Sequence, residues 1–179
     1  MSSDGPTSDD PESDDTDPPE VGPNGDLGGP DITGLGYVVS TPSGWMDGTE
    51  EFSRQNPNLT TLDKIFWWGD TFNTARGNVI VETQSSFGST DPSDLEENWK
   101  SALTSSDPSA EIYDLPDITI DGQSALTVEI DRPSNNVKQR AHLVISGDKG
   151  YSITVTYRNG DSDVPNEFDE ILDTWNWTN

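Results

Sequence analysis

The stretch ITIDGQSALTVEIDRPSNNVKQRAHLVISGDKGYSITVTY, residues 118–157, decides the fold of this chain. It holds four apolar runs separated by short segments rich in Gly, Asp, Asn and Pro, which are typical of turns. Parallel neighbouring strands would need a crossover of about a dozen residues or more, so turns this short predict antiparallel neighbours. We therefore predict a four-stranded meander with strands at residues 118–120, 125–130, 137–145 and 151–157.

Three further strands are predicted upstream of the meander. They are short apolar runs bounded by turn signals, at residues 37–39, 65–68 and 78–83. The run at 65–68 is apolar at successive positions, which predicts a strand covered on both faces.

Two amphipathic helices are predicted, one before the meander and one after it. The first begins at Thr90 or Asp91, with Pro92 in its first turn, and its acidic residues lie near the positive end of the helix dipole. Its apolar residues recur at helical spacing and are Leu95, Trp99, Ala102 and Leu103. The second begins near residues 162–165 and presents Phe168, Ile171, Leu172 and Trp175 on one face.

The order of these elements predicts an α+β fold. Three strands, a helix, four strands and a closing helix fit a mostly antiparallel sheet of six or seven strands packed against two main helices. We expect this domain to span residues 34–179 and to follow a leader at residues 1–33.

The leader is expected to be a disordered spacer. It consists almost entirely of Asp, Glu, Ser, Thr, Pro and Gly, with Val21 and Leu27 as its only sizeable apolar residues before Pro30. Such a segment cannot bury enough apolar surface to offset the entropy of ordering it. Acidic repulsion and repeated prolines should keep it extended.

The charge of the chain excludes some classes of partner. Its 34 acidic and 9 basic residues give a formal net charge of −25. Nucleic acids and anionic lipids are bound through clustered cations, so we expect no nucleic-acid partner. The acidity fits either general solubility or adaptation to high salt, and both interpretations stay open.

Several local motifs together resemble a known family. A P-x-G-W turn at residues 42–45 is followed by GNVIVETQ at 77–84 and by a helix opened by DPSDLEENW at 91–99. A D-G-x-x-A step at 121–125 and a final F-x-x-I-L-x-T-W helix at 168–175 complete the pattern. Over about residues 34–177 the chain resembles the PsbP-like superfamily and, within it, the LpqN-type cell-envelope lipoproteins of actinobacteria.

This resemblance implies an α/β/α sandwich and a non-enzymatic role in binding or assembly. Relatives include an extrinsic photosystem subunit, a nuclear import factor that binds a small GTPase, and envelope lipoproteins exported through a signal peptide that ends at a lipidated Cys. The chain contains neither that signal nor any Cys. We expect Met1 to stand where that Cys would be, with the leader as the tether of an extracellular, envelope-anchored domain.

Common catalytic chemistries lack their residues. With no Cys and with His142 as the only His, a catalytic triad or a multi-His metal site cannot form within one chain. A calcium loop beginning at Asp161 is rejected because Pro165 falls on a ligand position, and Asp161 and Asp163 are expected to cap the last helix. We predict no catalytic residues, no metal and no cofactor.

Five residues are candidates for contact with a ligand or partner. Arg132, Lys138 and Arg140 are the one local cluster of cations, and they either meet an anionic ligand or pair with Glu129 and Asp131 across the hairpin. Trp67 and Trp68 either line an apolar pocket or pack in the core.

The sequence thus favours a monomeric envelope lipoprotein domain that binds an unknown protein or small molecule and touches the membrane only through its anchor. The alternatives are a carboxylate-based hydrolase, which needs two facing carboxylates, and a purely structural solubility module of a halophile.

Overall fold

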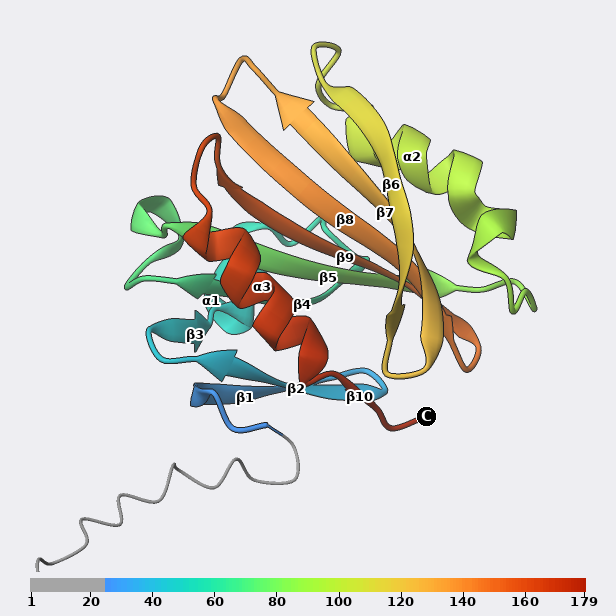
Figure 1. Ribbon diagram of the computed structural model, residues 1–179, viewed down its shortest axis with the longest axis horizontal. Coiled ribbons are helices and arrows are strands. Elements are labelled where there is room, and N and C mark those ends of the chain that lie inside the picture. The colour runs from blue at the N-terminus through green and yellow to red at the C-terminus, as the bar shows by residue number, and fades with distance from the viewer. Residues whose placement is uncertain (1–24) are drawn as a thin grey trace, which may run out of the picture.

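The computed structural model describes residues 25–179, and its centre is a seven-stranded antiparallel sheet (Figure 1). The strand order is β3-β4-β5-β9-β8-β7-β6. The strands span Trp45–Asp47 (β3), Leu62–Trp68 (β4), Gly77–Ser85 (β5), Glu111–Ile120 (β6), Gln123–Arg132 (β7), Val137–Ser146 (β8) and Lys149–Arg158 (β9).

The predicted meander is confirmed as β6 to β9. Consecutive strands pair through tight hairpins, and Ile120 lies opposite Gln123 across a two-residue turn. Asp121 and Gly122 in that turn both have positive φ, as a type I′ hairpin turn requires. β6 is longer than the sequence predicted. Most of its side chains are exposed at the sheet edge, so much of the strand lacks the apolar pattern from which a strand is predicted.

A second, three-stranded sheet was not predicted. It consists of β1 (Gly28–Gly34), β2 (Tyr37–Pro42) and β10 (Asn176–Trp177), in the order β1-β2-β10. The strand predicted at residues 37–39 therefore belongs to this small sheet. Tyr37 stacks on Trp175 with ring centroids 4.4 Å apart, which joins the beginning and the end of the domain.

The predicted boundary between leader and domain was wrong. β1 begins at Gly28 and Ile32 is fully buried, so the folded domain starts before residue 34. The glycines and Pro30 give β1 a leader-like composition, and its pairing with β2 outweighs this weak local preference. The rest of the expected leader, residues 1–24, lies outside the described residues.

The two predicted helices cover opposite faces of the large sheet. α3 (Asp163–Asp173) buries Val164, Phe168, Ile171 and Leu172 against β5 and β9. α2 (Glu96–Thr104), preceded by the 3₁₀ turn η2 (Pro92–Leu95), packs Trp99 against β7 and β8. The architecture is therefore an α/β/α sandwich, as expected.

The predicted helix starts are also confirmed, although Asp163, expected to cap the last helix together with Asp161, pairs with Arg76 instead. The Asp91 carboxylate accepts a hydrogen bond from the Ser93 backbone N–H at 2.9 Å. The Asp161 carboxylate likewise accepts from the backbone N–H groups of Asp163 and Val164. Both aspartates satisfy N–H groups that a helix start leaves without an intrahelical partner.

Two short helical segments were missed. α1 (Thr49–Gln55) and the 3₁₀ turn η1 (Phe72–Thr74) contain no buried residue, so neither has an apolar stripe to detect. Both lie beside β4, where Phe72 packs edge-on against the rings of Phe52 and Trp67.

The sheet ends differently at its two edges. β3 is only three residues long, whereas β6 runs for ten residues along the other edge. Pro116 interrupts β6, where the register with β7 shifts between Leu115 and Ile118. Acidic residues also line this edge strand, namely Glu111, Asp114 and Asp117.

Candidate functional site

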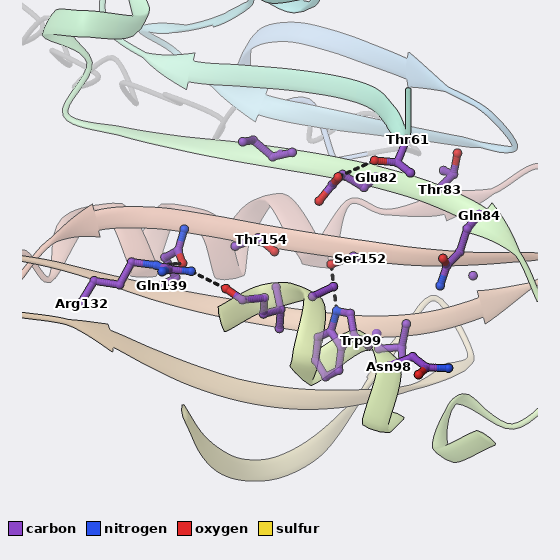
Figure 2. Close-up of a pocket in the computed structure, with 15 residues that line it drawn as sticks. Thr61, Glu82, Thr83, Gln84, Asn98, Trp99, Arg132, Gln139, Ser152 and Thr154 are labelled. Carbon is purple, nitrogen blue, oxygen red and sulfur yellow. Dashed lines mark hydrogen bonds between the residues drawn. The ribbon is translucent and has the colours of Figure 1, made fainter. Parts of the chain in front are cut away.

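The candidate site is a pocket of about 350 Å³ between α2 and strands β5, β8 and β9 of the large sheet (Figure 2). We call it the α2 pocket. It is lined by Thr61, Ile80, Glu82, Thr83, Gln84, Asn98, Trp99, Ala102, Leu103, Arg132, Gln139, Leu143, Gly150, Ser152 and Thr154.

The pocket forms where one face of the sheet changes from apolar to polar between neighbouring strands. On β7 and β8 this face is apolar, and Val128, Ile130 and Leu143 pack under α2. On β9 the same face carries Ser152 and Thr154. α2, a helix of nine residues, packs over the apolar half, and the pocket lies between it and the polar half.

Trp99 fixes α2 at the border between the two halves. Its ring is buried in the apolar cluster, and its indole N–H donates to the Ser152 hydroxyl at 2.9 Å. A tryptophan with an apolar body and a single donor suits such a border, because the ring and the N–H are both satisfied. The helix is thereby held at a defined distance from β9.

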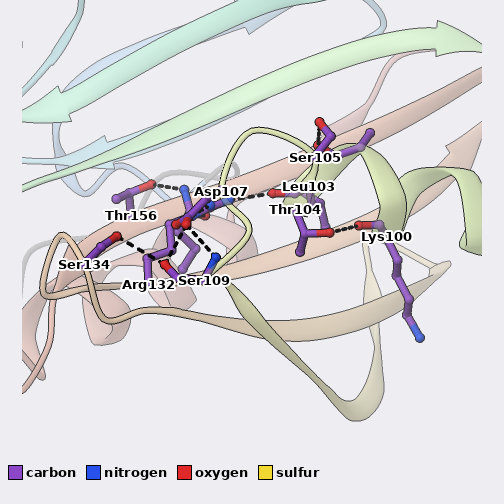
Figure 3. A network of polar contacts seen from close by, with 11 residues as sticks. Lys100, Leu103, Thr104, Ser105, Asp107, Ser109, Arg132, Ser134 and Thr156 are labelled. Atoms are coloured by element: carbon purple, nitrogen blue, oxygen red, sulfur yellow. Dashed lines mark hydrogen bonds and ion pairs between the residues drawn. The ribbon is translucent and has the colours of Figure 1, made fainter.

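Arg132 closes one end of the pocket. Its guanidinium donates to the Gln139 side chain at 2.7 Å, to the Asp107 carboxylate at 3.2 Å and to the backbone carbonyl of Leu103 (Figure 3). Gln139 in turn donates to the Thr156 hydroxyl at 2.9 Å. This network ties the end of α2 and the loop after it to β7, β8 and β9.

The network neutralises the charge of Arg132. Asp107 stays ionised, because hydrogen bonds from Ser109, followed by the interaction with Arg132, lower the pKa of its carboxyl group. Both side chains of this pair are largely buried, with 13% of Arg132 and 16% of Asp107 exposed.

Glu82 and Thr154 differ from the other polar groups of the pocket. The Glu82 carboxylate accepts a hydrogen bond from the Thr61 hydroxyl at 2.6 Å, and no cation of residues 25–179 lies within 4.0 Å of it. Thr154 is 9% exposed and, unlike Ser152 and Gln139, takes part in none of the hydrogen bonds of the pocket. The pocket therefore contains a carboxylate that can accept further hydrogen bonds.

The three predicted cations do not form one cluster. Arg132 shares its face with Val137, so it lies on the pocket side, whereas Lys138 and Arg140 point to the α3 side. Lys138 pairs with Glu129 at 2.8 Å, as one of the two interpretations expected. Arg140 pairs instead with Asp169 of α3, at 2.5 Å.

Neither tryptophan lines the α2 pocket, and of the two only Trp67 lies in the protein interior, whereas Trp68 is half-buried. Trp67 is fully buried, and its ring lies 5.9 Å from that of Phe72. Trp68 stacks on Trp45 at 6.3 Å, and the Arg76 guanidinium lies 4.8 Å from its ring. The α2 pocket is a different site from the aromatic pocket that the sequence suggested for these two residues.

His142 lies under α3, on the face of the sheet away from the pocket. Its Nδ1 is 2.9 Å from the Thr127 hydroxyl, and its ring stacks on Phe168. Burial first, and the charge of Arg140 second, lower the pKa of His142 to about 3. The imidazole is therefore neutral at neutral pH.

The described residues contain no cluster of metal ligands and no helix able to cross a bilayer. Within residues 25–179, no group of three or more His, Cys, Asp or Glu side chains is placed to hold a metal ion. None of the helices that the structure describes combines the length and apolar content needed to cross a bilayer.

Sequence reasoning missed most of the pocket. Of the predicted contact residues only Arg132 lines it. The remaining lining residues come from several elements, and half of them are Thr, Ser, Gln or Asn, which carry no motif. A usable signal was the polar alternation of SITVT at residues 152–156 beside apolar neighbours.

No protein-family model and no curated protein sequence matches the chain. Solved structures do match it. Cyanobacterial PsbP (CyanoP) from Synechocystis sp. PCC 6803 aligns with a TM-score of 0.56 and 15% identity, over 79% of this chain and 86% of that one. The Saccharomyces cerevisiae Ran-binding protein Mog1p aligns with a TM-score of 0.53 and 12% identity, over 83% and 97%.

A Bacteroides thetaiotaomicron VPI-5482 crystal structure also matches, with a TM-score of 0.55 and 14% identity over 84% of this chain. The chain spans about half of that protein, 49% of its length. At these identities the likeness concerns the fold alone. Residues 25–179 thus have an α+β fold of the PsbP and Mog1 type.

Proposed function

We propose that this chain is a non-enzymatic binding protein and that the α2 pocket is its ligand site. The observation that carries this proposal is the pocket itself, a concave site of about 350 Å³ whose lining joins apolar walls to a few polar groups. Pockets of this kind, with a small number of placed polar groups in an apolar lining, are the usual sites for small ligands. Mog1p, described as a Ran-binding protein, is a precedent for binding on this fold.

The hydrolase alternative has less support. Two-carboxylate hydrolysis needs a pair of carboxyl groups facing each other across the substrate. Glu82 is the one carboxylate among the residues that line the α2 pocket. A purely structural module needs no concave pocket, so the α2 pocket counts against that alternative.

A pocket-filling variant tests the proposal. Ala102 lines the pocket and sits on an exposed position of α2, so Ala102→Trp should fill the pocket without disturbing the core. Ser101→Trp adds the same ring at the neighbouring exposed position, which is not part of the lining, and is the matched control.

The measurement is native mass spectrometry of each protein after incubation with a cell-envelope extract of the source organism. We expect a bound species on the wild type and on Ser101→Trp, and its loss from Ala102→Trp. Equal retention by all three proteins, or no bound species on any, would refute the pocket as the binding site.

We further propose that the domain is held at the cell envelope by a lipid anchor at the end of its acidic leader, and that it acts there as a monomer. The support is the composition of the leader, which suits an extended spacer between a surface and a domain. Intact-mass analysis of the protein from the membrane fraction of its native host tests this. An unlipidated protein recovered from the cytoplasm contradicts it.

A further inference from the structure

We propose that the α2 pocket selects a ligand with a cationic group at the end of an alkyl chain, such as a primary amine. This inference rests on the proposed function, because it names the chemistry of the ligand that the pocket binds. It follows from the charges and the surfaces that line the pocket (Figure 2).

One of the charges in the pocket has no partner of opposite charge among the described residues. Two lining residues are charged, Arg132 and Glu82. Arg132 is neutralised by Asp107 and donates to two further acceptors, so it has little capacity left for an anion. Glu82 has only the Thr61 hydroxyl. The net unpaired charge of the pocket is therefore negative.

Residues 25–179 supply no cation that pairs with Glu82. All nine cations of the protein lie in this part, and eight of them pair with other carboxylates. The ninth, Arg158, ends β9 opposite Val137 and does not line the pocket. Glu82 is left for a cation from outside.

The lining of the pocket combines apolar walls with hydrogen-bond acceptors. Ile80, Leu103 and Leu143 provide apolar walls, and an alkyl chain buries its methylene groups well against such surface. The Thr154 hydroxyl and the Gln84 side chain, which line the same pocket as Glu82, can accept hydrogen bonds. An ammonium group has three N–H donors to satisfy and no acceptor of its own, so it matches this set.

The electrostatic field of the whole molecule also favours a cationic ligand. A formal charge of −25 attracts cationic molecules and repels anionic ones before they reach the pocket. A cationic ligand would therefore be favoured during its approach as well as in its bound position. The small volume, about 350 Å³, limits the occupant to one or two side chains of a peptide or a small free amine.

The experiment is isothermal titration calorimetry of the full chain with three small probes of similar length. Cadaverine carries amines, pentanediol carries hydroxyls and glutarate carries carboxylates. We expect cadaverine to bind at least about tenfold more tightly than pentanediol, because a charge-assisted hydrogen bond is stronger than a neutral one. Glutarate should not bind.

Two variants locate the effect. Glu82→Gln keeps the shape and the Thr61 contact but removes the charge, so cadaverine affinity should fall about tenfold. Glu170→Gln removes the same charge from an exposed position of α3, on the other side of the sheet, and should leave the affinity within about twofold. Equal weakening by both variants, or equal binding of the three probes, would overturn the inference.

A further arm distinguishes the source of the amine. A capped tripeptide with a central lysine should bind more tightly than cadaverine if the natural ligand is a polypeptide, and less tightly if it is a free amine. Either order supports the cationic ligand. The failure of this inference also differs from that of the proposed function: Glu82→Gln would then retain the envelope ligand that Ala102→Trp loses.

Discussion

The buried His142 should make the domain acid-labile in a pH range in which its carboxylates have little effect. The imidazole is almost completely buried between β8 and α3, where it contacts Thr127 and Phe168. Its Nε2 has no hydrogen-bond partner in the described part of the chain. A proton placed on this ring would create a charge away from water, close to the charge of Arg140.

The sign and the size of the effect follow from the pKa of His142 in the two states. The pKa is 6.5 in the unfolded chain and about 3 in the folded one. As the pH falls below 6.5, the unfolded state binds a proton that the folded state refuses, so the stability is fully present above 6.5 and decreases toward pH 3. Between about pH 7 and about pH 5 the loss is about 2 kcal/mol.

The carboxylates act mostly at lower pH. Hydrogen bonds lower the pKa of Asp107 and of Asp161 below the ordinary value of 3.8, from Ser109 in the first case and from Arg76 in the second. Their contribution to stability is therefore present above 3.8 and is lost only as the pH falls further. The range above about pH 5 isolates the histidine.

Urea unfolding followed by tryptophan fluorescence measures this, with His142→Asn as the comparison. The variant has no titrating ring, and its amide can reach the position of Nδ1, so it should lose the pH dependence above about pH 5 whatever its overall stability. An equal slope in both proteins, or an imidazole C–H resonance in the folded wild type that titrates near 6.5, would show that the ring is not kept neutral.

Three other changes should alter stability, as measured by the same unfolding assay. Arg132→Met should lower the stability because it leaves the Asp107 carboxylate without its cation, and Asp107→Asn in the same protein should restore part of the loss. Gly48→Ala should cost about 3 kcal/mol or more, since a Cβ there would lie 1.7 Å from the Trp67 ring; a neutral effect would mean that this ring moves freely. Phe87→Gly should gain about 1 kcal/mol because Phe87 is 81% exposed with a φ of +53°, and a loss would indicate an unseen contact of its ring.

Much of the fold could be predicted because its elements carry local apolar patterns. Leu95 and Trp99 mark the segment of η2 and α2, Phe168 and Ile171 mark α3, and all four are buried as the helical spacing predicts. The elements that could not be predicted have no such pattern. Ile32 is the one buried apolar residue of β1, and α1 buries none, so both depend on contacts with distant parts of the chain.

The site was harder to predict than the fold, for a physical reason. Pairing partners can be inferred from spacing, but the charge left after pairing cannot. Arg132 looked like one member of a cationic cluster, and its neutralisation depends on Asp107, which a different loop brings to it. Glu82 is one of 34 acidic residues, and only the three-dimensional arrangement leaves it unpaired in a pocket.

The exposed edge strand β6 has one more consequence. Ten residues of free backbone could template the addition of a strand from another molecule and so start intermolecular β-aggregation. Pro116 lacks the N–H that such pairing needs, and the register shift beside it bends the edge. Asp114 and Asp117 also place charged side chains on this edge, and charged residues on an edge strand oppose the pairing of an incoming strand. This strand thus carries features that oppose pairing with the same edge of a second copy.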